Sequence, residues 1–513
     1  MVFNSLAFLL FFPIVTVGYF FLTMRIGLRR KALSNTLSQI FLLAASLVFY
    51  GYWNPAYLVL ILISVAVTWV SGLLMEGRNA GEKRLVLIAS LVINLGILFF
   101  FKYYGFFAET AGIISRGGIR FPSFNVLLPV GISFYTFQAL GYSIDVYYGR
   151  VKAERNFITY ALFVTFFPQL VAGPIERSGN LLPQFKANYE FDYDRVTSGL
   201  RLAAWGMFKK VVIADRLAIY VNGVFENPSV YPGTSVALAV FFFAFQIYCD
   251  FSGYSDIAIG CARVLGFNLM TNFRQPYFSR SITEFWRRWH ISLSTWLKDY
   301  IYIPLGGNRK GEARKALNLL ITFLLSGLWH GAAWHFVVWG ALHAIFQITG
   351  RSTKPLRNAL ARKVGLPEES RPRKVIQICA TFIMVCFAWI FFRANTMQDA
   401  FLIIAKLSRL PLELAGYVQG LSHNGIIMTV RNMFQMGIDV ANPIQGFGLT
   451  NFGLSGIFIA ALLIADVLMW KMPEVAIVKQ KPLVLRWAGY YALMLAILLS
   501  WNTESSQFIY FTF

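Results

Sequence analysis

The stretch that decides the fold reads SITEFWRRWHISLSTWLKDYIYIPLGGNRKGEARKALNLLITFLLSGLWHGAAWHFVVWGALHA, from Ser281 to Ala344. Four of the five histidines of the chain lie in it: His290, His330, His335 and His343. An apolar run from Leu317 to Leu328 leads directly into Trp329-His330-Gly331. An ionisable residue inside an apolar span is costly in a bilayer and therefore marks a functional site. We expect the rest of the chain to be a scaffold for these residues.

The composition of the chain sets its class. Of the 513 residues, 57% are hydrophobic and 14% are charged, whereas soluble domains carry about 25% charged residues. The net charge of +22 is also typical of nucleic-acid-binding proteins. Here, however, the basic residues lie in short clusters between apolar runs, which is the positive-inside pattern of membrane proteins. We therefore predict that the protein is surrounded by membrane lipids and does not bind nucleic acid. The four cysteines form no CxxC pair, so neither disulfides nor a zinc site are indicated.

The apolar runs predict an all-α polytopic membrane protein. Roughly ten to twelve helices are expected by length and apolarity, in a single domain of residues 1–513 with the catalytic centre within residues 250–344. The runs are Ser5–Met24, Leu37–Tyr52, Tyr57–Leu74, Leu85–Phe101, Val126–Tyr148, Phe157–Arg177, Leu200–Val221, Val236–Gly266, Leu317–Leu328, Val375–Phe392, Leu454–Trp470 and Leu485–Trp501. Basic residues follow the first run instead of preceding it, as in a retained first helix with an extracytoplasmic N-terminus.

Some segments are expected to depart from simple spans. Pro168 and Pro174 interrupt the run Phe157–Arg177, and irregular backbone at membrane depth is tolerated only inside protein or beside a water-filled cavity. This favours a re-entrant or broken helix. Residues Ala108 to Asn125 are predicted to form an outer loop, and Ala394 to Asn451 is the longest candidate outer segment. The basic segments Arg351–Lys374 and Lys471–Arg486 are predicted to be cytoplasmic.

Charged residues also occur within the apolar runs. Lys209 and Lys210 lie near a helix end, where long side chains can reach the interface, and we expect that arrangement. Asp250 and Asp256 each cost about 2.5–3.5 kcal/mol at membrane depth and therefore need partners. The candidate partners are Arg287, Arg288 and His290. The aspartates either take part in the site or only hold helices together, and the sequence leaves both hypotheses open.

The chemistry of the centre is best explained by a histidine general base. Imidazole titrates near neutrality and can take a proton from a hydroxyl as it attacks a carbonyl. We assign this role to His330 and expect the neighbouring Trp329 to be a supporting residue of the site. His330 and His335 are about 140° apart around a helix, and the glutamate of the zinc-protease motif is missing, so no metal site is predicted. His335 and His343 are expected to be hydrogen-bonded core residues.

His290 is the second candidate catalytic residue, although an interfacial or core histidine is the alternative. It is expected to approach His330 from a helix that carries Trp286 and Ser294 on the same face, four residues before and after it. Two basic groups offer cations to an anionic ligand. Arg288 is a supporting candidate, and Arg309 and Lys310 are candidates for binding the donor. No G-x-S-x-G or P-loop motif occurs.

Several strings along the chain resemble one family. They are LPVGISFYTFQ (128–138), FPQLVAGPIER (167–177), DFSGYSDIAIG (250–260), SITEFWRRWHISLSTWLKDYIYIPLGGNR (281–309), LSGLWHGAAWHFVVWG (325–340) and the C-terminal FIYFTF. Together they resemble the membrane-bound O-acyltransferase family, and within it the bacterial branch that contains the alginate O-acetyltransferase membrane subunit. The likeness covers nearly the whole chain. The invariant WHG histidine of the family falls on His330, and its WHIS histidine falls on His290.

The resemblance implies a helical protein of the bacterial inner membrane with a central funnel or tunnel. It implies acetyl-CoA as a cytoplasmic donor substrate, no bound cofactor, and export of the acetyl group to an extracytoplasmic polysaccharide such as alginate. A separate serine esterase-like transferase would carry the group to the polymer. Peptidoglycan, cellulose and D-alanylated teichoic acids are served by relatives, and the motifs do not separate them. The alternative class is a transporter or flippase for an acyl carrier or polymer precursor, which uses similar helix breaks.

Overall fold

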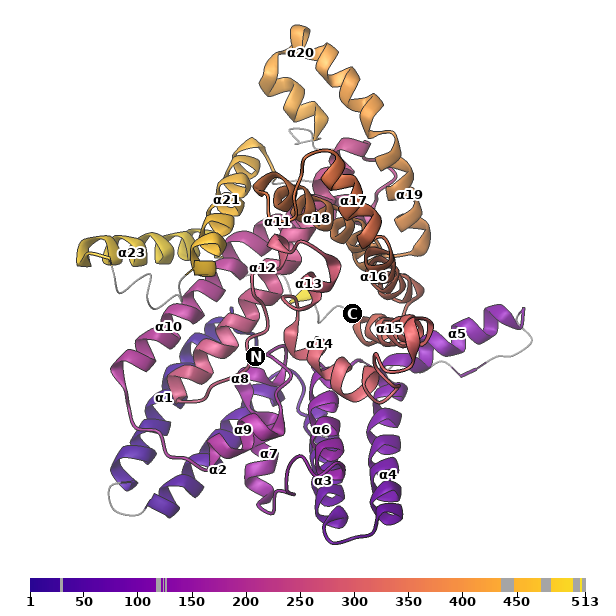
Figure 1. The fold of residues 1–513 in the computed structure, drawn as a ribbon. Helices are drawn as coiled ribbons and strands as arrows, with labels where there is room; N and C mark the ends of the chain where they lie inside the picture. Colours follow the sequence, from indigo (N-terminus) through magenta and orange to yellow (C-terminus); the bar gives the residue numbers. More distant parts are fainter. Residues whose placement is uncertain are drawn as a thin grey trace.

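The computed structural model describes residues 1–27, 31–116, 121–122, 124, 127–434, 447–471, 481–501 and 508–509. Within these ranges every regular element is a helix (Figure 1). Eight helices of the described chain have the length and apolar composition needed to cross a bilayer. They are Leu6–Arg25, Lys31–Gly51, Tyr57–Met75, Ala80–Ile114, Gly233–Leu265, Arg371–Arg393, Leu449–Trp470 and Leu483–Ser500. The protein is a polytopic membrane protein, as predicted, and the other expected spans form shorter or more polar helices.

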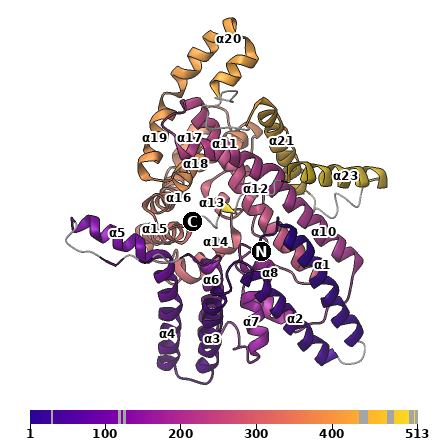
Figure 2. The same ribbon diagram turned by 180° about the vertical axis from the view of Figure 1, so that it is seen from behind.

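The N-terminal helices follow the predicted apolar runs. They are α1 (Leu6–Phe21), η1 (Leu22–Ile26), α2 (Lys31–Gly51), α3 (Tyr57–Met75), α4 (Ala80–Leu98), η2 (Phe99–Tyr103) and α5 (Tyr104–Ile114). Helices α3 and α4 lie side by side at one end of the molecule, and α5 projects from its side (Figures 1 and 2). The predicted span end at Phe101 is wrong, as is the loop from Ala108. The helix continues to Ile114 because residues 104–114 are largely apolar and contain no proline.

The broken span around Pro168 is confirmed. The chain forms α6 (Ile132–Tyr147), α7 (Phe157–Thr165), α8 (Phe167–Leu170) and α9 (Ser178–Phe185). Between α7 and α8, Phe166 has a non-helical backbone (φ −52°, ψ 111°). The residues on both sides of the break are buried in the protein. This is the environment in which irregular backbone is tolerated at membrane depth.

The long helix α12 (Gly233–Leu265) crosses the middle of the molecule and packs very closely on α10 (Tyr193–Met207). Between them in the chain lie η3 (Phe208–Ala214) and α11 (Asp215–Glu226). Gly199 and Gly206 of α10 face Gly260 and Gly253 of α12. A Cβ atom on Gly199 would lie 2.6 Å from the Gly260 carbonyl oxygen. Small residues at such spacing let membrane helices approach until their backbones touch.

This close packing determines where two lysines lie. Lys209 and Lys210 are in the π-helical segment η3, and both are buried. The prediction that they reach the interface is therefore wrong. Lys209 Nζ lies 2.6 Å from Asp256 Oδ2, and Lys210 Nζ lies 2.6 Å from Asp250 Oδ1 and 2.8 Å from Asp215 Oδ1. Buried charges need such partners because an isolated ion is very costly in a low-dielectric interior.

The predicted partners of the two aspartates are corrected by the same contacts. Neither Asp250 nor Asp256 forms a described ion pair with Arg287, Arg288 or His290. The lysines take their place because the glycine contacts align η3 with this part of α12. The aspartates therefore connect η3 with α12, as the helix-holding hypothesis expects, and their part in the site stays a prediction.

The segment with the histidines folds into short central helices and a long hairpin. Its elements are η4 (Pro276–Phe278), α13 (Ile282–Trp286), α14 (Ile291–Leu297), η5 (Lys298–Tyr302), α15 (Gly311–His330), α16 (Trp334–Ser352), α17 (Lys354–Lys363) and α18 (Arg371–Arg393). Both views place α13 and α14 near the middle of the molecule (Figures 1 and 2). In the hairpin, a Cβ atom on Gly327 would lie 2.2 Å from the Phe336 carbonyl oxygen, so α15 and α16 are in backbone contact.

The C-terminal helices are α19 (Met397–Ser408), α20 (Leu410–Met433), α21 (Leu449–Lys471) and α23 (Leu483–Ser500). Helices α19 and α20 occupy the described part of the predicted outer segment Ala394–Asn451, and α20 extends away from the rest of the molecule (Figure 1). Parts of several sequence features lie outside the described residues. They are the basic turn after the first helix (28–30), the predicted outer loop Ala108–Asn125 (117–120, 123 and 125), the predicted outer segment Ala394–Asn451 (435–446), the basic turn Lys471–Arg486 (472–480) and the motif FIYFTF (510–513).

Candidate active site

His330 is the last residue of α15 and is 2% exposed. The helix ends there because Gly331 has an extended backbone. The imidazole is surrounded by aromatic rings. Its centroid lies 4.9 Å from those of Trp329 and Trp339 and 5.3 Å from that of Phe392. These walls exclude bulk water from the ring, so each electrostatic contact there is stronger than it would be in water.

His290 begins α14 and has a left-handed backbone with φ 43° and ψ 55°. This conformation is uncommon for a residue with a side chain, and such residues cluster at functional sites. The prediction that one helix carries Trp286, His290 and Ser294 is wrong, because this turn separates α13 from α14. Trp286 Nε1 donates to His343 Nδ1 (3.2 Å), and Ser294 Oγ donates to the Trp289 carbonyl (3.3 Å).

Asn272 fixes the tautomer of His290. Asn272 Oδ1 accepts hydrogen bonds from the Ser292 backbone N–H (3.3 Å) and from Ser292 Oγ (3.0 Å), so this atom is the amide oxygen. His290 Nδ1 lies 3.1 Å from the same oxygen and must therefore carry the proton. In the neutral ring the lone pair is then on Nε2. No spacing or motif in the sequence singles out Asn272.

The structure brings the two predicted histidines together. The ring centroids of His290 and His330 are 6.4 Å apart, with the planes at 63°. Trp329 contacts both rings, at 5.7 Å and 4.9 Å. The prediction that His290 approaches His330 is confirmed, although it does so from a turn instead of a helix face. Two imidazoles at this separation can act on one substrate group held between or beside them.

A small cavity of about 30 Å³ lies beside His330. Its lining comes from four parts of the chain: Lys102, residues 128–134, Val171, and Trp329 with His330. This is room for water but too little for an acyl thioester. The start of α6 and the broken span at α8 thus meet the end of α15 here. Substrate binding requires these elements to move apart.

Lys102 is a site residue that the sequence analysis missed. Its Nζ donates to the backbone carbonyls of Trp329 (2.7 Å) and His330 (3.3 Å) and to Ser133 Oγ (3.3 Å). The signal was present in the sequence, because a lysine within FFFKYYGFF is an ionisable residue in an apolar run. The predicted end of the span at Phe101 places Lys102 outside the apolar run.

Three other predicted site residues lie away from the histidine pair. Arg288 pairs with Glu284 (2.7 Å) and stacks on Trp470, with its guanidinium carbon 4.0 Å from the ring centroid. Arg309 and Lys310 are exposed in the turn before α15. A helix of this length spans about 30 Å, so they are separated from His330 by the whole of α15.

His335 and His343 are hydrogen-bonded core residues, as predicted. His335 Nδ1 lies 3.0 Å from the Phe391 carbonyl oxygen and therefore donates to it. His343 is fully buried, and its Nδ1 accepts the hydrogen bond from the Trp286 indole. Neither residue lines the cavity beside His330. Their place in the packing explains their presence without a catalytic role.

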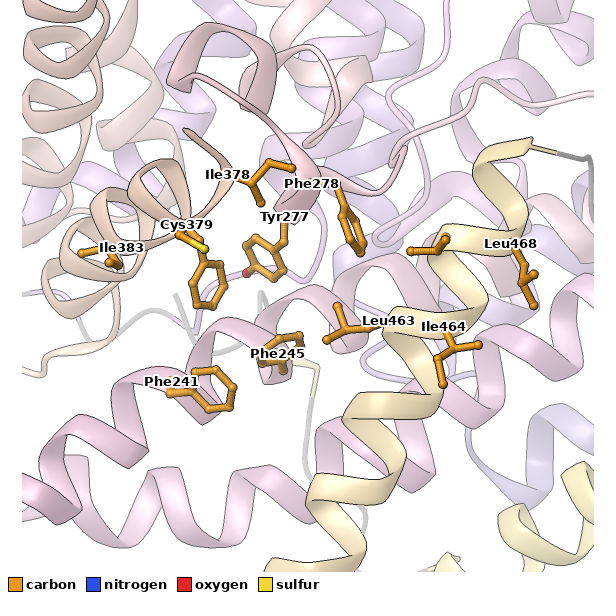
Figure 3. A pocket seen from close by; sticks show the side chains of 12 residues that line it. Phe241, Phe245, Tyr277, Phe278, Ile378, Cys379, Ile383, Leu463, Ile464 and Leu468 are labelled. Carbon is orange, nitrogen blue, oxygen red and sulfur yellow. The ribbon is translucent and has the colours of Figure 1, made fainter. Parts of the chain in front are cut away.

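An apolar groove of about 660 Å³ lies between α12, α18 and α21 (Figure 3). Phe245, Phe382 and Leu463 are typical of its lining, which contains no histidine or carboxylate. Figure 3 shows these aromatic and aliphatic side chains around an open space. The groove suits hydrocarbon. Neither histidine of the candidate pair lines it, so we do not assign the reaction to it.

The chain belongs to the membrane-bound O-acyltransferase family. Residues 151–397 match the family model described as MBOAT, membrane-bound O-acyltransferase family. A probable alginate O-acetylase AlgI from Pseudomonas syringae pv. tomato is 40% identical over 407 residues, which cover 78% of this chain and 74% of the relative. A peptidoglycan O-acetyltransferase from Helicobacter pylori is 34% identical over 466 residues, covering 84% and 85%. Because the family consists of O-acyltransferases, its match identifies this chain as an O-acyltransferase and not as a transporter.

A more distant relative transfers a different group. A teichoic acid D-alanyltransferase from Bacillus subtilis is 24% identical over 326 residues, covering 61% of this chain and 79% of the relative. The matched family region contains both His290 and His330 and ends within α19. Lys102 lies before its first residue.

Proposed function

We propose that this protein takes an acetyl group from acetyl-CoA on the cytoplasmic side of the bacterial inner membrane. The group is passed on for O-acetylation of an extracytoplasmic polysaccharide, with His330 as the general base. The observation that carries the proposal is the His290–His330 pair, with ring centroids 6.4 Å apart, of which His330 lines a cavity in the helical bundle. The relatives named as O-acetylase and O-acetyltransferase support acetyl as the group transferred.

The proposed reaction is an acyl transfer from a thioester to a hydroxyl. His330 removes the proton of the hydroxyl as its oxygen attacks the carbonyl carbon. The carbon–sulfur bond then breaks, and the imidazolium returns the proton to the leaving CoA thiolate. The product is an ester and free CoA, so no oxidant, metal or cofactor is consumed. His290, whose Nδ1 proton faces Asn272, orients or polarises the reacting groups.

The direction of transfer follows from the charge distribution. Arg309 and Lys310 are exposed at one end of α15, and His330 is at the other. The charge rule places the basic end in the cytoplasm and the N-terminus of the chain outside. The phosphates of CoA would then bind at the basic turn, with the thioester reaching inward toward the cavity.

The first candidate acceptor is alginate, because of the 40% identity to the AlgI protein. Peptidoglycan is the second candidate, since its O-acetyltransferase aligns over a larger share of both chains. The two acceptors differ in the partner that must deliver the group. Deleting the gene in its own host and measuring ester-linked acetate on each isolated polymer separates them.

The donor chemistry is tested with purified protein. We expect release of free CoA from acetyl-CoA by the wild type, with water in place of the acceptor hydroxyl and acetate as the second product. Release by His330→Ala should be at most about 1% of this, with His335→Ala as the control for loss of a buried histidine. Thiol release by the wild type that is equal to that of His330→Ala would contradict the proposed reaction. Release of CoA from other acyl-CoA esters but not from acetyl-CoA would show that the transferred group is not acetyl. The proposed role of His330 as the base would be unaffected.

A further inference from the structure

Lys102 is a charged residue in the middle of a membrane span. It lies in η2, within the span Ala80–Ile114. Among the described residues, no aspartate or glutamate forms an ion pair with it. Lys209 and Lys210, by contrast, both have carboxylate partners. A lysine at membrane depth without such a partner is costly, so its position requires another explanation.

The partners of Lys102 are backbone carbonyls at the end of one helix. Its Nζ donates to Trp329 O (2.7 Å) and His330 O (3.3 Å). The next residue, Tyr103, donates through its hydroxyl to Leu328 O (2.9 Å). The last carbonyls of a helix have no partner within the helix, and a cation there is favoured by the helix dipole. Lys102 and Tyr103 therefore cap the end of α15 that carries His330.

Two further contacts connect Lys102 with the site. Its Nζ donates to Ser133 Oγ (3.3 Å) at the start of α6, and Lys102 and Ser133 line the cavity beside His330. The ammonium thus joins three elements, η2, α6 and α15, at the place where the base must be held. Hydrogen bonds from a charged donor are shorter and stronger than neutral ones. The segment η2 is π-helical, and such segments are frequent at functional sites.

We propose that Lys102 is a positioning residue for His330. Its ammonium fixes the C-terminal end of α15 so that the imidazole faces the cavity in the orientation that proton transfer requires. The inference rests on the proposed function, in which His330 is the base. A displacement of about 1 Å at a reacting group can lower a rate by roughly 10²-fold, so the position of this helix end matters for catalysis.

The test uses the full-length purified protein and three variants. Lys102→Met keeps the length of the side chain and removes the donors. Tyr103→Phe is the matched control, because it removes a donor to the same helix end one residue further from His330. Lys102→Arg keeps the charge. CoA release gives kcat and the donor KM, and thermal unfolding in detergent reports on the fold.

We expect Lys102→Met to lower kcat by about 10²-fold with a nearly unchanged KM. Tyr103→Phe should stay within about tenfold of the wild type, and Lys102→Arg should recover much of the loss. A loss below tenfold in Lys102→Met overturns the proposal. The proposal is also overturned if Lys102→Met and Tyr103→Phe lower kcat by the same factor and lower the unfolding temperature by the same amount. That pattern would indicate that both residues only cap the helix.

If Lys102→Met does not accumulate as folded protein, the test uses Lys102→Gln instead. This variant removes the charge but keeps an N–H donor that can help the protein to fold. A loss of kcat above tenfold at unchanged KM supports the proposal, and a smaller loss overturns it. Wild-type protein that releases no CoA contradicts the proposed donor and not the role of Lys102. The same variants are then compared by ester-linked acyl groups on the polymers of cells that produce them.

Discussion

The imidazole of His290 lies 6.4 Å from that of His330, and the indole of Trp329 contacts both rings. The two histidines reach this position by different means. His330 ends a long helix, whereas His290 occupies a strained left-handed turn that Asn272 holds through its side-chain oxygen and backbone carbonyl. Strain of this kind persists only where the surrounding contacts enforce it. The pair is therefore a feature that the fold maintains.

Replacement of His330 by alanine is expected to abolish transfer. A general base contributes roughly 10²- to 10⁴-fold to the rate, so residual CoA release should be at most about 1% of the wild type. The protein should still insert and accumulate, because His330 is enclosed by aromatic rings that remain. His335→Ala, which removes a hydrogen-bonded histidine from α16, should retain activity. Comparable activity of the two variants would contradict the role of His330.

The contribution of His290 is separated from its backbone by the choice of variant. Asparagine tolerates the left-handed conformation better than alanine does, so His290→Asn removes the ring and preserves the turn. We expect kcat to fall by roughly 10²-fold, the usual loss for one stabilising group. Asn272→Ala should give a smaller loss, because the ring remains but its tautomer is no longer fixed. The measurement is the rate of CoA release at saturating donor. A wild-type rate in His290→Asn would show that the ring takes no part.

Much of the fold could be predicted because apolar length and proline position have direct physical consequences. The runs at 57–74 and 454–470 became α3 and α21, and the break at Pro168 followed from the missing backbone donor. The histidine pair could be predicted because an ionisable residue in an apolar span demands a reason. In each case the residue type alone limits the possible environments.

The partners of charged residues could not be predicted in the same way. The sign of Asp250 allows any cation, and the choice of Lys210 depends on the contact between α10 and α12 and on the π-helical turn that aims the lysine inward. Asn272 reaches His290 through tertiary packing that no spacing announces. Lys102 is an ionisable residue in an apolar run and could have been predicted as a site residue, but the predicted span ends one residue before it. Helix ends remain the least defined feature of a sequence pattern.

The buried ion pairs predict a large effect on stability. Lys210→Met leaves the carboxylates of Asp250 and Asp215 without their shared cation, and breaking a buried pair costs about 3–5 kcal/mol. We expect a clear drop in unfolding temperature in detergent. The double variant Lys210→Met/Asp250→Asn should recover part of the loss, since coupled residues are not additive. Equal unfolding temperatures of the wild type and Lys210→Met would contradict this account.

The entrance for the donor is predicted at the exposed turn before α15. Neutralising Arg309 and Lys310 together should raise the donor KM more than it lowers kcat, which is the pattern for lost uniform binding. The reason is that two cations near the phosphates of CoA bind substrate and transition state alike. Arg357→Gln/Arg362→Gln on α17 is a matched control, because it removes two charges from another predicted cytoplasmic segment. A KM that is unchanged, or raised equally by the control, would argue against this entrance.

Transfer to the polymer is predicted to depend on a separate protein. The cavity at His330 measures about 30 Å³, so a polysaccharide chain would need a far wider opening than the thioester to reach the base. The segment Ala394–Asn451 carries no G-x-S-x-G signature. We expect a serine esterase-like transferase to receive the acetyl group at the outer face. The segment α20 bends at Gly425 and extends from the molecule. It exposes apolar side chains on both sides of the bend, with Leu412 78% and Ile426 71% exposed, and is the docking surface to test first.

The decisive measurement is ester-linked acetate on the polymer in cells that synthesise it but lack every candidate transferase. With this protein alone we expect CoA release in isolated membranes, with water as the acceptor and free acetate as the second product. No acetate should appear on the polymer, because the acceptor hydroxyl of the partner is missing. Adding the partner should restore acetylation, and Leu412→Glu/Ile426→Glu on α20 should weaken it while thioester turnover is kept. Acetylation of the polymer without any partner would show that the polymer, or its lipid-linked precursor, reaches His330 directly. The cavity would then have to open far more widely than it does in this structure.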